Sequence, residues 1–461
     1  MKTTLPEPVA VPAADGDLSA ELHTDYGYYS FGKWLYHPDR VVHVKEGAFR
    51  EVMPVSVQLI PTLYCNFGCP RCSYGQAKED IEALGQRNMM HMDKAIMLRI
   101  IDRLIEAGVK GIVFTGGGEP TLNPDLIGGM RHAAEKGLKL GLFTNGSLLN
   151  EQKIRAILKL SPTFLRVSLD AGSLLAHRLL HGYAEKHDYL KTILANIATM
   201  AKAKQNISPA TTIGIGVSVE PINLHDLVEV ARRLREIVEM PPLGGIDYLV
   251  FRPMVNYDRG KFYHMAEPLL DYLRQHLPEH HDAYHRYMYE GAQLPASIFE
   301  QADRIIDGEV SETLTGTGVK VINIRTKMIG ISHADRPHKK CRASSWYFFV
   351  GPDGTVYNCV ELGLDPRVAL GNLLTHSLGE IWQSRRRQEV MDFIDHKGLH
   401  VLCPPVCLYY EMNNLFEKIA EALQTGGAAK AATLKWIAEQ EARVQAEAET
   451  GVFSQSHREF I

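Results

Sequence analysis

The 461-residue sequence has no long hydrophobic run and no large excess of charge of either sign. Nowhere do about 18 consecutive apolar residues occur, which a membrane-spanning helix would require. Residues 1–6 contain no apolar core of signal-peptide length. The formal net charge is -4 at pH 7 with histidine neutral, so overall charge does not predict nucleic-acid binding. We therefore expect a cytoplasmic protein with no membrane partner and no evident nucleic-acid partner.

Cysteine is scarce, with seven residues in the chain. In a reducing compartment such thiols are better interpreted as metal ligands than as disulfides. Cys65, Cys69 and Cys72 follow an apolar stretch with C-x3-C-x2-C spacing. Thiolate is the soft donor that iron-sulfur clusters require, and three ligands on a short loop can reach three corners of a cube-shaped cluster. One iron would stay open for another ligand. A zinc loop or a disulfide framework is the alternative interpretation.

Short apolar strands alternate with amphipathic helices between residues 51 and 255. This alternation is typical of a parallel sheet with right-handed crossovers, and it predicts an α/β fold, a partial (β/α)6 TIM-like barrel. The predicted strands are 55–60, 111–115, 139–144, 164–169, 212–219 and 246–251. Helices are predicted to begin at Asp93, Asn123-Pro124, Asn150, about 186 and Asp226.

Polar or glycine residues follow each predicted strand. In barrels of this kind the C-terminal ends of the strands converge on the face that carries the chemistry. After the cysteine loop, these residues are Gly116, Gly117, Gly118, Glu119, Asn145, Ser168, Asp170, Glu220 and Arg252. An ordinary polar turn residue is the alternative interpretation of any one of them.

A second group of cysteines lies nearer the C-terminus. Cys341 is followed after 12 residues by Gly354 and then by Cys359, across a predicted hairpin. Cys403 and Cys407 follow with C-x3-C spacing. Four thiols can fill all four corners of a second cluster, and a structural zinc ion on the same cysteines is the alternative.

The first cysteine loop and Thr115-Gly116-Gly117-Gly118-Glu119-Pro120 resemble the motifs of the radical SAM superfamily, over about residues 55–255. In that family a three-cysteine [4Fe-4S] cluster is completed by the amino and carboxylate groups of S-adenosylmethionine (SAM). The resemblance implies that the glycine motif binds the SAM amino group and that Ser168 and Asp170 contact its ribose or carboxylate. It also implies weaker contacts by Asn145, Glu220 and Arg252.

One position departs from the family pattern, because Arg71 stands before the third cysteine where the family often has an aromatic residue. Phe67, Tyr74 or the guanidinium of Arg71 is the expected substitute for stacking on the adenine of SAM.

Residues 341–410 resemble the SPASM and twitch auxiliary-cluster extensions of radical SAM enzymes, in which C-x(9–15)-G-x4-C opens the domain. The intermediate cysteines of a full SPASM pattern are missing here. The resemblance therefore implies one auxiliary [4Fe-4S] cluster, held by Cys341, Cys359, Cys403 and Cys407.

By resemblance, the reduced cluster cleaves SAM to methionine and a 5'-deoxyadenosyl radical, which abstracts hydrogen from the substrate. A one-electron reductant such as flavodoxin or ferredoxin is then an expected partner. Three and four ligands account for all seven cysteines, so none is left as an acid or hydrogen donor. A fully ligated auxiliary cluster is better suited to accept the electron of the substrate radical than to bind substrate, which favours a two-electron oxidation.

We therefore predict a radical SAM oxidoreductase that acts on a small molecule or a natural-product intermediate. A peptide-modifying maturase is the first alternative, and about 50 residues before the first strand favour the small molecule over it. A non-catalytic, metal-stabilised binding protein is the alternative from another class. The sequence has no readable pattern for the substrate, the catalytic base or the oligomeric state.

The expected organisation has five parts: a tail with an aromatic extension (1–50), the radical SAM core (51–255), a substrate-facing helical region (256–335), the auxiliary cluster domain (336–410) and C-terminal helices (411–461). The polar stretch in the third part is interpreted as a solvated helix face rather than a metal site, and it contains His264, His276, His280, His281 and His285. Residues 316–320 are interpreted as a turn, and Gly426-Gly427 as the break between the last two helices.

Overall fold

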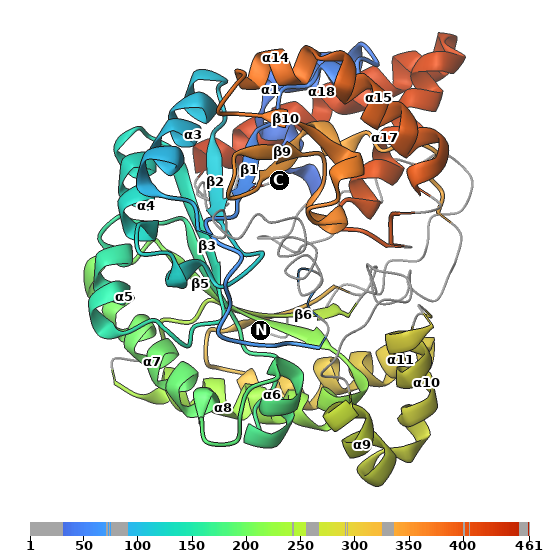
Figure 1. The fold of residues 1–461 in the computed structure, drawn as a ribbon. Helices are drawn as coiled ribbons and strands as arrows, with labels where there is room; N and C mark the ends of the chain where they lie inside the picture. Colours follow the sequence, from blue (N-terminus) through green and yellow to red (C-terminus); the bar gives the residue numbers. More distant parts are fainter. Residues whose placement is uncertain are drawn as a thin grey trace.

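One ten-stranded sheet organises the chain, in the order β10-β9-β8-β1-β2-β3-β4-β5-β6-β7. The computed structural model describes residues 31–70, 72, 74, 91–241, 244–254, 267–290, 292, 294–324, 336–399, 402–404, 406–450 and 460. The α/β class predicted from the sequence is confirmed (Figure 1).

Six successive parallel strands form the barrel part of the sheet. They are β1 (Ser56–Leu59), β2 (Gly111–Phe114), β3 (Lys139–Thr144), β4 (Phe164–Ser168), β5 (Thr212–Val219) and β6 (Tyr248–Pro253). Each pairs in parallel with the next. Nearly every residue of these strands is buried or half-buried, as expected for parallel strands that are covered on both faces. The predicted partial barrel is therefore confirmed.

Helices between these strands cover the outer face of the sheet (Figure 1). They are α3 (Lys94–Glu106), α4 (Leu126–Glu135), α5 (Glu151–Leu158), α6 (Leu174–His181), α7 (Tyr189–Ile207) and α8 (Leu227–Glu239). Asp93 and Asn150 cap α3 and α5, since their side chains accept hydrogen bonds from Ile96 N and Lys153 N.

The predicted N-cap at Asn123 is wrong. The Asn123 amide donates to the carbonyl oxygens of Pro61 and Met92, at 2.7 and 2.8 Å, and so connects the first strand to the segment before α3. Its side-chain oxygen accepts from Asp125 N at 2.8 Å in a turn, and α4 begins after that turn, at Leu126.

Four further strands extend the sheet at both ends. Strand β7 (Lys320–Asn323) lies beside β6, so the predicted turn ends before Lys320, although Gly316 and Gly318 have the positive φ angles of a turn, 78° and 80°. Strand β8 (Tyr347–Val350) pairs in parallel with β1. Strands β9 (Thr355–Tyr357) and β10 (Ala369–Asn372) follow as antiparallel neighbours. The cysteine-rich C-terminal part therefore continues the barrel sheet.

Helix α1 (Pro38–Lys45) precedes β1, and two further groups of helices follow β6. Between β6 and β7 lie α9 (Glu267–His276), α10 (Pro278–Tyr289), α11 (Ala296–Ile305) and α12 (Ser311–Leu314). After β10 come α14 (Leu378–Gln383), α15 (Arg385–Phe393), α17 (Tyr410–Thr425) and α18 (Gly427–Thr450). The predicted break at Gly426-Gly427 is present, whereas His264 lies outside the described residues.

The N-terminal segment packs on the C-terminal helices. The ring centroid of Trp34 lies 5.3 Å from that of Phe416 and 6.2 Å from that of Trp346. Trp382 also donates to the carbonyl oxygen of Val52 at 2.7 Å. The aromatic extension therefore forms a second hydrophobic core with the C-terminal part, whereas the sequence led us to expect packing on the main domain.

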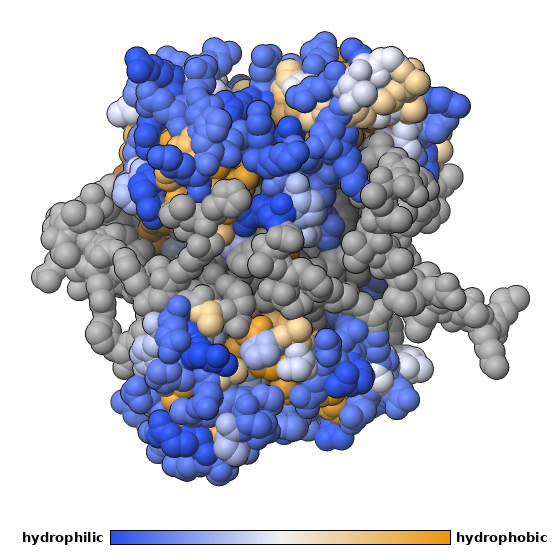
Figure 2. All heavy atoms as spheres, turned by 90° about the vertical axis from the view of Figure 1, so that its right-hand side faces the viewer, coloured by the Kyte–Doolittle hydropathy of each residue, from blue (hydrophilic) through white to orange (hydrophobic). Residues whose placement is uncertain are grey.

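The described surface is mainly hydrophilic on the face shown in Figure 2, with hydrophobic residues in small patches. Within the part of the chain that the structure describes, no helix is long and apolar enough to cross a bilayer.

Candidate cluster and cofactor site

The cysteine loop after β1 lies against the glycine motif after β2. Gly118 N donates to Thr62 O at 3.0 Å, and Glu119 N donates to Tyr64 O at 2.8 Å, immediately before Cys65. A Cβ atom at Gly118 would overlap the carbonyl group of Tyr64. Glycine is therefore required here because two backbones approach closely.

The end of α6 holds the same cysteine loop from another side. Gly68 N donates to His181 O at 3.0 Å, and Cys69 Sγ lies 3.3 Å from His181 Nδ1. Gly182 ends the helix with φ 56°, and a Cβ atom there would overlap Gly68 O. His181 was not predicted, because it meets Cys69 across 112 residues of sequence and only through the fold.

The loop after β3 provides a third contact. Asn145 Nδ2 donates to Asn66 Oδ1 at 3.0 Å, and Asn66 Nδ2 donates to Ser147 Oγ at 2.8 Å. Asn145 Oδ1 also accepts from the hydroxyl of Ser147 at 2.7 Å. In this structure the predicted SAM contact Asn145 thus orients the cysteine loop.

The buried carboxylate of Glu119 accepts four hydrogen bonds. Its donors are the backbone N–H and hydroxyl of Thr121, the hydroxyl of Thr144 and the backbone N–H of Asn145, at 2.6 to 3.1 Å. Burial raises the pKa of this carboxyl group, while the hydrogen bonds act in the opposite direction. Glu119 therefore fixes the glycine motif to the end of β3.

Asp170 has a left-handed backbone, with φ 58°, which is uncommon for a residue other than glycine. Its Oδ1 accepts from Ser218 N at 2.7 Å, and its carbonyl oxygen accepts from Asn223 Nδ2 at 2.7 Å. Its Oδ2 lies 3.5 Å from His181 Nε2. Asp170 consequently connects β5 to the histidine beside Cys69.

The other residues predicted to contact SAM differ in how deeply they are buried. Ser168 and Arg252 are half-buried at the ends of β4 and β6, where β5 lies between them. Glu220 is completely buried and accepts a hydrogen bond from the hydroxyl of Tyr284 on α10 at 2.5 Å.

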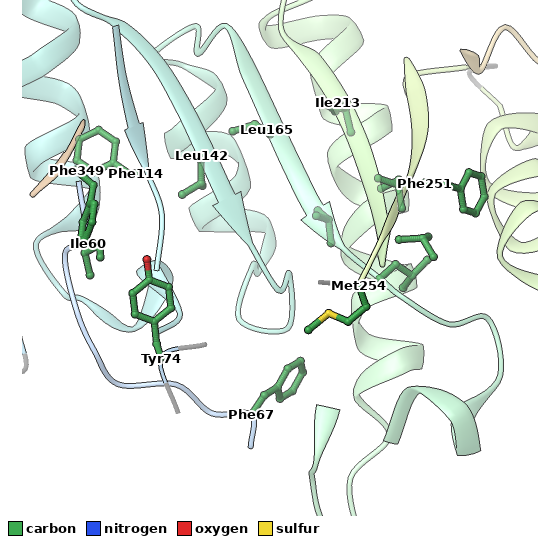
Figure 3. Packing of buried hydrophobic residues seen from close by; sticks show 14 of the residues in the cluster. Ile60, Phe67, Tyr74, Phe114, Leu142, Leu165, Ile213, Phe251, Met254 and Phe349 are labelled. Atoms are coloured by element: carbon green, nitrogen blue, oxygen red, sulfur yellow. The ribbon is translucent and has the colours of Figure 1, made fainter. Parts of the chain in front are cut away.

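Both aromatic candidates for adenine stacking are packed in the core. Phe67 is 5% exposed, and its ring centroid lies 5.4 Å from that of Tyr183 in a stacked arrangement. Tyr74 is 9% exposed and lies under Gly117. Figure 3 shows Phe67, Tyr74 and Met254 on the side to which the barrel strands point. Arg71 lies outside the described residues.

The second group of cysteines lies where β8, β9 and α17 meet. Cys341 precedes β8, Cys359 follows β9, and Cys403 and Cys407 precede α17. Burial raises the pKa of the thiols of Cys341, Cys359 and Cys403. The buried environment therefore disfavours the thiolate form of each cysteine. A bound cation favours loss of the proton.

Four thiols suit either a tetrahedral zinc ion or a four-iron cluster. Across the described ranges, no three His, Cys, Asp or Glu side chains form a group that could hold one metal ion.

Hydrogen-bond donors surround these thiols. Asn413 Nδ2 lies 3.7 Å from Cys341 Sγ. Within the described residues, the buried hydroxyls of Tyr74, Tyr347 and Tyr409 have no hydrogen-bond partner. Burying a hydroxyl without a partner is unfavourable, so this space fits an occupant rich in acceptors, such as the sulfides and thiolates of an iron-sulfur cluster.

Comparison with known families supports this reading of the two cysteine groups. Residues 59–234 match the model of the radical SAM superfamily, and residues 341–408 match the model of the SPASM iron-sulfur cluster-binding domain. The chain therefore belongs to the radical SAM superfamily and carries a SPASM domain. The first of these domains binds SAM and a [4Fe-4S] cluster, and the second binds auxiliary iron-sulfur clusters.

Three curated relatives illustrate the range of this family. A tungsten-containing aldehyde ferredoxin oxidoreductase cofactor-modifying protein of Pyrococcus furiosus is 28% identical over 38% of this chain and 46% of its own length. An AdoMet-dependent heme synthase of Methanosarcina barkeri is 26% identical over 70% of this chain and 80% of its own. A PqqA peptide cyclase of Gluconobacter oxydans is 24% identical over 71% and 76%. The chain thus spans less than half of the first relative.

A solved structure shows the same fold. Streptococcus suis SuiB bound to S-adenosylmethionine covers 86% of this chain and 79% of its own, with a TM-score of 0.54 and 12% identity. At this identity, the likeness concerns the fold alone.

Proposed function

We propose that this protein is a radical SAM oxidoreductase that removes two electrons from a small-molecule or natural-product substrate. The observation that carries the proposal is the single sheet that joins the two cysteine groups, because β8 of the SPASM domain pairs directly with β1 of the barrel. Both groups therefore belong to one sheet, with the first group after β1 and Cys341 before the neighbouring strand β8.

Each cysteine group has an assigned role in the proposal. Cys65, Cys69 and Cys72 hold the SAM-binding cluster, and Cys341, Cys359, Cys403 and Cys407 hold one auxiliary cluster. When bound, the cofactors supply the electron that cleaves SAM, the 5'-deoxyadenosyl radical that takes hydrogen from the substrate, and an acceptor for the electron that remains on the substrate.

The protein's own residues position these groups. Glu119, Asn145 and the glycine motif fix the cysteine loop against the ends of β2 and β3 through the hydrogen bonds described above. Ser168 and Arg252 are half-buried at the strand ends and are assigned to the polar groups of SAM or substrate, because a guanidinium suits a carboxylate. In net terms the substrate would lose one hydrogen atom, one electron and one proton. SAM, reduced to methionine and 5'-deoxyadenosine, would be the oxidant, once the electron accepted by the auxiliary cluster is passed back to the reductant or to the first cluster.

The substrate class rests on the relatives. The heme synthase aligns over 80% of its length, which supports a small molecule. The peptide cyclase aligns over a similar share, and peptide modification is therefore the second candidate. A one-electron reductant of the flavodoxin or ferredoxin type would serve either reaction.

Two measurements test the proposal. The anaerobically reconstituted protein is given a low-molecular-weight metabolite fraction or a peptide fraction, and 5'-deoxyadenosine above the substrate-free background is measured. Stimulation by metabolites alone supports the first candidate, and stimulation by peptides alone supports the second.

The second measurement uses Cys403→Ala with Cys407→Ala. This variant is expected to form 5'-deoxyadenosine while the oxidised product is lost. Full product formation by the variant would overturn the role of the auxiliary cluster as electron acceptor.

A further inference from the structure

The surroundings of the C-terminal cysteines include neutral hydrogen-bond donors beside the charged side chains of Arg336, Glu361 and Asp395. Asn413 is completely buried, and its Oδ1 accepts from the backbone N–H groups of Arg342 and Ala343 at 2.8 and 2.9 Å. Because both partners are N–H donors, these two bonds identify the atom that faces the backbone as the side-chain oxygen. They leave the amide nitrogen facing Cys341 Sγ at 3.7 Å, so Asn413 acts as an oriented donor to a thiol sulfur.

Two buried tyrosines lie in the part of the core that contains Cys359. Tyr347 and Tyr409 are 3% and 4% exposed, and their ring centroids lie 5.6 Å apart. They share one buried cluster with Cys359, against which Cys407 packs. Neither hydroxyl has a hydrogen-bond partner within the described residues.

Leaving two hydroxyls unsatisfied in one buried cluster is unfavourable. Tyrosine in the un-ionised form donates its hydroxyl hydrogen, whereas bridging sulfides and cysteine thiolates only accept. The missing partner of both hydroxyls is therefore an acceptor, and the auxiliary cluster supplies several.

We propose that Asn413, Tyr347 and Tyr409 are positioning residues that donate hydrogen bonds to the sulfur atoms of the auxiliary cluster and raise its reduction potential. Donation to sulfur stabilises the reduced cluster, which carries more negative charge. The nearby carboxylate of Glu361, whose Oε1 accepts from Leu408 N at 2.7 Å, acts in the opposite direction. The proposal rests on the proposed function, because it makes the auxiliary cluster a better electron acceptor.

The test uses a background in which only the auxiliary cluster can form, namely Cys65→Ala with Cys69→Ala and Cys72→Ala. Tyr347→Phe and Tyr409→Phe remove only the hydroxyls. Asn413→Asp keeps the oxygen that accepts from the backbone and replaces the donor. Tyr357→Phe is the matched control, because that ring stacks on Phe349 at 4.8 Å and its hydroxyl interacts with Thr355.

Iron and sulfide are counted in each reconstituted protein, and the midpoint potential is obtained from a redox titration followed by electron paramagnetic resonance. At the parent's midpoint, the Tyr347→Phe and Tyr409→Phe double variant should show an oxidised-to-reduced ratio raised about tenfold, which is a downward shift of about 59 mV for one electron. The Tyr357→Phe control should stay within about twofold of the parent.

Two results would overturn the proposal, and they are distinguishable. If the double variant keeps its iron and its oxidised-to-reduced ratio is unchanged, the tyrosines do not tune the potential, and the proposed function is unaffected. If the variant that lacks Cys65, Cys69 and Cys72 binds no iron, the auxiliary cluster does not form. The electron-accepting step of the proposed function is then also excluded. Far-UV circular dichroism confirms that each variant is folded.

Discussion

The carboxylate of Glu119 accepts a hydrogen bond from the backbone N–H of Asn145 at 2.7 Å, across the ends of two neighbouring strands. This bond joins the glycine motif to the loop that holds Asn66 of the cysteine segment. The cluster loop and the cofactor motif are therefore connected before any cofactor binds.

Replacement of Glu119 by Gln should destabilise the protein and weaken SAM binding. The amide can replace only one of the two acceptor oxygens, so at least one buried donor loses its partner, at a cost of about 1–3 kcal/mol in the free energy of unfolding. Denaturant unfolding and equilibrium dialysis with labelled SAM measure both effects. Glu236→Gln on the exposed surface of α8 is the control, and equal behaviour of the two variants would contradict the role of Glu119.

Alanine at Gly118 should remove SAM binding without removing iron. The added Cβ overlaps the backbone at Tyr64, so the motif must move, while Cys65, Cys69 and Cys72 are unchanged. We expect a SAM dissociation constant at least about tenfold higher, with an iron content like that of the parent.

Gly128→Ala is the matched control for this substitution. Its Cβ would have only Lys94 Cε nearby, at 3.8 Å, and glycine within a helix is less favourable than alanine by about 1 kcal/mol. The control should bind SAM normally. Unimpaired binding by Gly118→Ala would contradict the assignment of the motif.

The free energy of unfolding should decrease as the pH is lowered, because His338 takes up a proton more readily in the unfolded chain. Burial lowers the pKa of this residue to about 4, as do the charges of Arg336 and Arg342, while the hydrogen bond to Asn414 and the charge of Glu417 act in the opposite direction. The folded pKa lies below the ordinary value of 6.5, so the unfolded chain binds the proton more readily. The contribution is present above about pH 6.5 and is lost as the pH falls toward 4.

Between pH 7.5 and 5 this group should reduce the free energy of unfolding by about 2 kcal/mol. Urea unfolding at several pH values measures the slope. His338→Gln cannot titrate and should have a flatter pH profile. If both proteins have the same profile, His338 does not produce the effect.

The sequence predicted the parts of the fold that local patterns encode. Strands β1 to β6 are short apolar runs between helices with recognisable ends, such as Asp93 and Asn150. The pairing of β8 with β1 was not predicted, because Tyr347 and Ser56 are far apart in the chain and no local signal specifies their register. Strand β7 is only four residues long and has no alternating pattern.

In the candidate site, too, residues in local sequence patterns were predicted and residues that meet only through tertiary contacts were not. Spacing predicted the seven cysteine ligands and the glycine motif, because most of these residues lie in short local patterns. His181 and Asn413 were missed because each meets its cysteine only through tertiary contacts, at 3.3 Å from Cys69 and 3.7 Å from Cys341. An isolated histidine or asparagine in a helix has no pattern that distinguishes it from other polar residues.

The measurement that tests the central claim most directly is iron and sulfide per chain after anaerobic reconstitution, together with 5'-deoxyadenosine formed from SAM after reduction by dithionite. The two-cluster account predicts about eight irons and nucleoside formation in the parent. It predicts about four irons and no nucleoside when Cys65, Cys69 and Cys72 are replaced by alanine. A parent protein that binds zinc instead of iron and leaves SAM intact would contradict it.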